Sequence, residues 1–100
     1  MALGKADLTA ATNTTLYTVP AGKTAACSVN FCNRFATPVT VRLAISATGT
    51  PDNSEWLFYD VVITGNGSLE RSGLVVQAGE LVVVYAASAG VSAMCYGYEE

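Results

Sequence analysis

Val39-Thr40-Val41-Arg42-Leu43-Ala44-Ile45-Ser46 is the stretch in which residue types alternate most regularly. Its odd-numbered residues, all apolar, fall on one face of an extended chain, and its even-numbered residues fall on the other. A period of two residues is typical of a β-strand with one face in a core and the other toward water or a partner. The stretch therefore predicts a half-buried strand.

Short segments of the same kind lie on both sides of this stretch, separated by turn residues. The further strands that we expect are 16–19, 24–32, 55–63, 69–76, 81–87 and 91–98. Thr64-Gly65-Asn66-Gly67 predicts a hairpin, because Asn-Gly favours a tight primed turn. No window shows a helical stripe, and Val and Thr are abundant. The fold class that we predict is all-β, a single antiparallel β-sandwich of about seven or eight strands, either immunoglobulin-like or jelly-roll.

The 100 residues suffice for one domain and are too few for two. Residues 1–14 show little periodicity, and we read them as an extended N-terminal arm. Residues 15–100 are then the β-sandwich domain. The longest connection that we expect is the loop 47–54, which contains Gly, Pro, Asp and Asn.

The composition is unusually apolar for a chain of this size. Hydrophobic residues make up 51% and charged residues 13% of the chain, whereas an average soluble domain has about 25% charged residues. A small domain buries only about 60–65% of the surface of its unfolded chain. We therefore expect apolar surface that a partner or further copies of the chain cover. The alternative is that small Ala and Val residues raise the apolar fraction and are tolerated at the surface.

The segment 81–87 is apolar on both faces and needs cover on both. The residues that we expect at an interface between subunits are Leu81, Val83, Tyr85, Met94 and Tyr96. Val83→Asp should then break assembly and leave the fold intact. The alternative is a central strand whose outer face is shielded by the N-terminal arm or by the loop 47–54.

Several kinds of chemistry are excluded or disfavoured by residue type. The chain has no His, so Ser–His and Cys–His nucleophilic pairs are impossible. The carboxylates are scattered, and the Asp52, Asn53 and Glu55 set lacks the spacing of a calcium loop. A net charge of −3 with five Lys and Arg disfavours nucleic acid, and no basic amphipathic segment suggests a membrane surface. We expect no enzyme, no catalytic residue, no cofactor and no metal.

The three cysteines, Cys27, Cys32 and Cys95, are not the even set of a secreted disulfide framework. The first residues hold no apolar stretch of signal-peptide length, so we expect synthesis in a cytoplasm, where thiols stay reduced and pack like small apolar groups. A Cys27–Cys95 disulfide, or an intermolecular one through Cys32, remains open for oxidising conditions.

Trp56, Phe58 and Tyr59 lie beside the longest loop. Trp56 and Tyr59 could contact a glycan, since loops beside strands carry many binding sites. Regular alternation puts Trp56 and Phe58 on one strand face and Tyr59 on the other, and this favours a core or interface role.

The strings Leu16–Thr24 (LYTVPAGKT), Val29–Arg34 (VNFCNR), Val39–Arg42 (VTVR) and Gly73–Leu81 (GLVVQAGEL) resemble small virion proteins of tailed bacteriophages. The resemblance covers roughly residues 15–98 and consists of turn and strand strings. It implies a β-sandwich component of the virion that is made in the host bacterial cytoplasm. It supplies no catalytic residues.

The function that we expect is non-enzymatic: a capsid decoration or cement protein that forms a trimer and stabilises the shell. Its partners would be further copies of itself and the major capsid protein or another virion protein. One alternative is a tail, fibre or baseplate component. Another is a carbohydrate-binding module that uses Trp56 and Tyr59.

Overall fold

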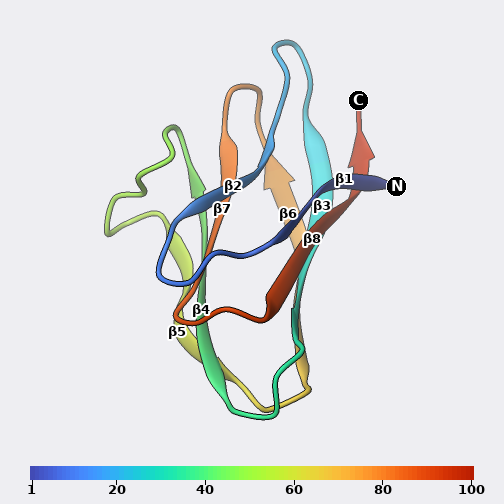
Figure 1. Ribbon diagram of the computed structural model, residues 1–100. Coiled ribbons are helices and arrows are strands. Elements are labelled where there is room, and N and C mark those ends of the chain that lie inside the picture. The colour runs from blue at the N-terminus through green and yellow to red at the C-terminus, as the bar shows by residue number, and fades with distance from the viewer.

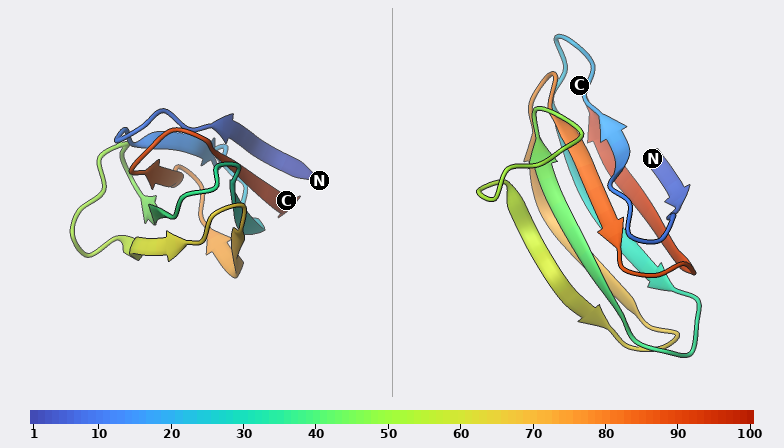
Figure 2. Two further views of the ribbon diagram at one scale, coloured as in Figure 1. Left: turned by 60° about the horizontal axis from the view of Figure 1, so that its bottom comes forward. Right: turned by 60° about the vertical axis from the view of Figure 1, so that its left-hand side comes forward.

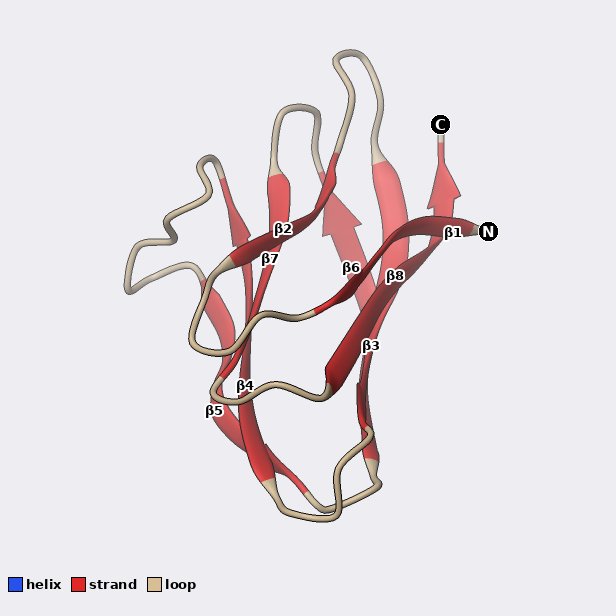
Figure 3. Ribbon diagram, viewed as in Figure 1, coloured by secondary structure: helices blue, strands red, loops and turns tan.

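Alternating apolar residues form eight strands that pair into two sheets (Figure 1). The computed structural model describes residues 1–100, and only strands and loops occur in it (Figure 3). The strands are β1 (Ala2–Asp7), β2 (Thr14–Thr18), β3 (Ala25–Asn33), β4 (Val39–Ser46), β5 (Trp56–Ile63), β6 (Ser68–Val76), β7 (Leu81–Ala86) and β8 (Val91–Glu99). The predicted all-β antiparallel sandwich is confirmed.

The order of the strands decides between the two sandwich types. The first sheet has the order β1-β8-β3-β6 and the second sheet has the order β2-β7-β4-β5. β1 pairs with β8, β2 with β7, β3 with β6 and β4 with β5, each time antiparallel. The chain is therefore one long double-stranded ribbon that folds back between β4 and β5 and wraps around the core (Figure 2). This wrapping is the jelly roll.

The core lies between the inner faces of the two sheets. β3 buries every second residue, and Val29 and Phe31 are fully buried in its middle. In β4, Val41 and Leu43 face the core as the alternation predicts. Ala44 is also buried although it belongs to the opposite face, so a part of the outer surface of the second sheet is covered as well.

The predicted arm over residues 1–14 needs correction, because residues 2–7 form β1 at an edge of the first sheet. Gly4 passes so close to β2 that a Cβ there would overlap the carbonyl oxygen of Leu16. Leu8 follows as a buried residue, and its N–H donates to the carbonyl of Val91 (2.9 Å). The alternation was weak because β1 is an edge strand whose side chains are only exposed or half-buried.

The turn at Thr64-Gly65-Asn66-Gly67 lies where the sequence predicts one, but it is not a hairpin. β6 pairs with β3 in the first sheet, so the turn carries the chain from one sheet to the other. Asn66 has a φ of 57°, and Gly65 does not have a positive φ. A primed turn requires positive φ at its first central residue, so this turn is of another type.

Asn33 fastens this turn to the loop that follows β3. Its buried side-chain amide donates to the carbonyls of Thr37 (2.8 Å), Thr64 (3.2 Å) and Ile63 (3.4 Å), and its oxygen accepts from the N–H of Phe35 (3.1 Å). One side chain thus joins β3 to two loops and to the end of β5. Buried carbonyl groups need such partners, because no water reaches them.

Asn33→Ala should lower the free energy of unfolding by about 3 kcal/mol, since it leaves buried polar groups without partners. Urea unfolding followed by circular dichroism measures this loss. Asn13→Ala is the matched control, because Asn13 is exposed. Equal stabilities of the two variants would contradict the role of Asn33.

Candidate functional site

The five predicted interface residues lie on two different surfaces. Leu81, Val83 and Tyr85 belong to the outer face of the second sheet, because Val82, Val84 and Ala86 point into the core. Met94 and Tyr96 belong to the outer face of the first sheet, because Ala93 and Cys95 point into the core. The structure therefore does not bring the five residues together into one patch.

Val83 is covered by the chain itself, which corrects its assignment to an interface. Its exposure is 0%. A Cβ placed on Gly49 would lie 3.7 Å from Oγ1 of Thr15, and Thr15 is the residue of β2 that pairs with Val83. The loop after β4 must therefore cross the outer face of β7 to reach β2 (Figure 2, right). Shielding by the long loop, the alternative left open by the sequence, is what the structure has.

Val83→Asp should unfold the chain and not merely disassemble it. A carboxylate at a fully buried position without a partner costs about 4 kcal/mol or more, a large part of the stability of a small domain. Loss of the circular dichroism signal of the folded protein at 25 °C, or absence of a cooperative transition on heating, checks this. Val62→Asp is the control, because Val62 is 60% exposed on β5; a folded Val83→Asp protein would contradict the burial.

Glu55 holds the covering loop in place. Its Oε1 accepts from the N–H of Asp52 (2.8 Å) and from the hydroxyl of buried Ser46 (2.9 Å). The hydrogen bond from the backbone of Asp52 and then that from Ser46 lower the pKa of the Glu55 carboxyl. Of the set Asp52, Asn53 and Glu55, Asp52 and Glu55 thus form a structural clamp on the loop.

The charge on Glu55 should make the stability of this loop depend on pH. Because the folded-state pKa is lowered, the contribution is complete above the unfolded value of 4.5 and is lost as pH falls through the folded value. Thermal unfolding from about pH 6 down to about pH 3 measures this loss. In Glu55→Gln the part of the pH dependence that belongs to Glu55 should disappear, and an unchanged profile would contradict the clamp.

The outer face of the first sheet carries exposed apolar side chains. Met94 is 40% exposed and Tyr98 is 65% exposed, and Val75 of β6 lies in the same row as Tyr98. Beside Met94 lies an open hollow of about 540 Å³. Its lining includes Lys5, Asp7, Asn30, Cys32, Ser92 and Tyr96. Of these residues, only Tyr96 was expected at an interface from the sequence. Lys5 and Asp7 were missed because β1 was read as an arm, and Asn30, Cys32 and Ser92 were missed because no residue pattern shows which strands lie side by side.

Charge is distributed unevenly across this face. Lys5 of β1 pairs with Met94, Met94 pairs with Asn30 of β3, and Asn30 pairs with Glu70 of β6. One row of the sheet therefore ends in a cation at one edge and in a carboxylate at the other. The side-chain oxygen of Asn30 in the middle is buried and has no hydrogen-bond partner. Tyr96 donates its hydroxyl hydrogen to Glu70.

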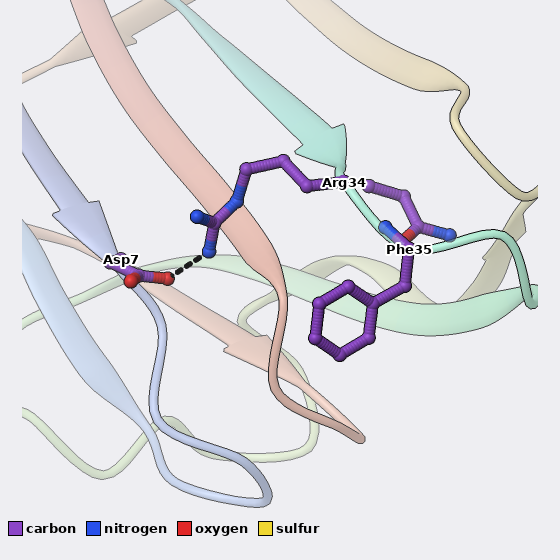
Figure 4. Close-up of polar contacts among 4 residues, drawn as sticks. Asp7, Arg34 and Phe35 are labelled. Carbon is purple, nitrogen blue, oxygen red and sulfur yellow. Dashed lines mark hydrogen bonds and ion pairs between the residues drawn. The ribbon is translucent and has the colours of Figure 1, made fainter.

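At the end of the same sheet, Arg34 reaches across β8 to form an ion pair with Asp7 (Figure 4). Phe35 points away from this pair, and its ring lies against Gly90, where an added Cβ would be 2.8 Å from the ring. Gly90 has a φ of 95°. These contacts join the loop after β3 to β1 and to the connection between β7 and β8, so they fix the border of the outer face.

A second group of side chains gathers on the outer face of the second sheet, and we call it the aromatic–arginine cluster. Its members are Arg42, Trp56, Tyr59, Asp60 and Tyr85. The Cζ atom of Arg42 lies 4.1 Å from the ring centre of Tyr59 and 4.3 Å from that of Tyr85. The rings of Trp56 and Tyr59 meet edge to face with centres 5.5 Å apart. Trp56 and Phe58 do not share a face, contrary to the sequence-based expectation, since Phe58 packs on the core.

The cysteines are free thiols, and only two of them are buried. Cys27 and Cys95 face the core, while Cys32 is exposed on the outer face of the first sheet. Hydrogen bonding with Cys27 and then burial raise the pKa of the Cys95 thiol, so this thiol stays protonated at neutral pH.

No group of three or more His, Cys, Asp or Glu residues comes together in a metal-binding arrangement. The structure holds no helix of the length and apolarity that would cross a bilayer. Comparison of the chain with protein-family models, with curated proteins and with solved structures found no significant match.

Proposed function

We propose that the chain is a non-enzymatic structural protein of a bacteriophage particle, a capsid decoration or cement protein that assembles through the outer face of its first sheet. The observation that carries the proposal is the exposed apolar surface around Met94, Tyr98 and Val75 beside a hollow of about 540 Å³. Exposed apolar side chains gathered on one face in this way mark contact sites on soluble domains. Jelly rolls also occur in viral capsid proteins, an analogy of fold that supports the proposal without carrying it.

The occupant of this face that we favour is a second copy of the chain. The face is positive at the edge of Lys5 and negative at the edge of Glu70, so the two edges of neighbouring copies attract each other.

The size of the face limits how strong one contact can be. Four strands about 4.8 Å apart and about nine residues long present about 550 Å² on each copy, or about 1,100 Å² in total for a pair. This area is at the low end for specific interfaces, so a single contact would be weak. Repetition on a particle raises the overall affinity without any new contact. A decoration protein is repeated at many equivalent positions, so weak single contacts are enough to hold it on the particle.

At protein concentrations high enough to populate a weak contact, Met94→Glu and Tyr98→Glu should convert the oligomer to monomer and leave the thermal midpoint within a few degrees. Both side chains are exposed in the single chain, so a charge there costs little in the fold but much in a dry interface. Light scattering after size-exclusion chromatography gives the mass. Val62→Glu, on an exposed position of the other sheet, should keep the mass of the original protein. Unchanged mass in both variants would exclude this face as the contact.

The place in the particle is tested with gold-labelled antibody against the chain, viewed on intact particles of the phage that encodes it. Label over the head supports decoration. Label confined to the tail end overturns it in favour of the tail, fibre or baseplate alternative. A chain that neither labels intact particles nor appears in a blot of disrupted ones is not a virion component.

A further inference from the structure

The aromatic–arginine cluster is not used by the proposed assembly, because it lies on the outer face of the second sheet. Arg42 lies at its centre, between the rings of Tyr59 and Tyr85. Its Nε donates to Oδ1 of Asp60 (2.7 Å), and its Nη2 donates to Oδ2 (3.4 Å). Trp56, the only tryptophan of the chain, adds a third ring at 5.9 Å from Cζ of Arg42.

The cluster exists because β5 departs from regular alternation. In an unbroken strand, Trp56 and Tyr59 are three positions apart and point to opposite faces. The register with β4 shifts twice here, once on each side of Leu43. Asp60 also has a φ of 55°, a conformation that residues other than glycine seldom adopt. Bulges of this kind re-aim side chains and are common beside functional sites.

The side chains of the cluster keep hydrogen-bond donors and acceptors free for a ligand. Arg42 has five N–H donors, and its pairing with Asp60 uses two of them. The Asp60 carboxylate keeps unshared lone pairs toward solvent. Tyr59 is 56% exposed, so part of its ring stays open. An exposed ring beside an adjacent donor and acceptor matches a sugar ring, which has an apolar C–H face and vicinal hydroxyls that both donate and accept.

We propose that the aromatic–arginine cluster binds a neutral saccharide, with the sugar stacked on Tyr59 and its hydroxyls bound by Arg42 and Asp60. A neutral ligand is favoured because the charges of Arg42 and Asp60 cancel and the whole chain carries −3, which repels acidic sugars. The three hollows of the structure lie elsewhere, so the saccharide lies across an open surface and binds weakly. The proposal does not depend on the first sheet, and both faces can be occupied at once.

The test is a titration of the full chain with maltotetraose, cellotetraose and mannotetraose as neutral probes and with 3′-sialyllactose as the acidic probe. Binding is followed by the fluorescence of Trp56, which lies within the cluster, and in parallel by calorimetry. We expect saturable binding of at least one neutral tetrasaccharide and weaker binding of the acidic probe. No neutral binding by either method up to about 10 mM, or a preference for the acidic probe, would overturn the proposal.

Three variants assign the binding to the cluster. Tyr59→Ala should weaken the affinity about tenfold, the loss of one stacked ring. Asp60→Asn keeps a residue type that tolerates positive φ but loses the charge, and it should weaken binding with little change in thermal midpoint. Phe35→Ala removes an aromatic ring of similar exposure, 54% against 56% for Tyr59, that is part of neither the cluster nor the assembly surface, and it should leave the affinity unchanged. Equal affinities of the Tyr59→Ala and Phe35→Ala proteins would place the sugar elsewhere and contradict the assignment.

Discussion

β7 has apolar side chains on both faces, and water must be kept from both. Its inner face meets the core, as in any sandwich. Its outer face, at Val83, is closed by the loop between β4 and β5, which Glu55 holds through Asp52 and Ser46. This cover decides how the two surfaces of the domain differ. The outer face of the second sheet is partly closed by its own chain, whereas the outer face of the first sheet keeps its apolar side chains exposed.

The two faces therefore differ in what they present. The first is a broad surface with Met94, Tyr98 and opposite charges at its edges. The second offers a small cluster in which one guanidinium is sandwiched between two tyrosines. The two proposals therefore use opposite faces of the domain, and assembly does not compete with saccharide binding.

Most of the fold follows from local patterns in the sequence, since strands that bury one face alternate visibly. The stretch 39–46 has the bounds that its alternation predicts. β1 escaped prediction because an edge strand buries little, so its alternation is faint, although Gly4 marks a close approach of two backbones. The aromatic–arginine cluster escaped because two register shifts change which residues of β5 face outward, and no residue pattern signals them. Val83 is buried because the loop between β4 and β5 lies over it, and the periodicity of the strands does not predict the path of that loop.

The wrapping of the ribbon also has a consequence for the speed and the order of folding. β4 and β5 are separated only by residues 47–55, whereas β1 and β8 are separated by residues 8–90. Joining distant segments costs more chain entropy than joining near ones. Pairing of β4 with β5 brings β3 and β6 closer together, so less chain has to be ordered for the next pair to form. We therefore expect pairing to proceed from β4 and β5 outward, with β1 and β8 pairing last. Chains dominated by such distant pairings fold in milliseconds to seconds. Until β1 pairs with β8, the open edge of the first sheet is the part of this domain most prone to mispairing and aggregation.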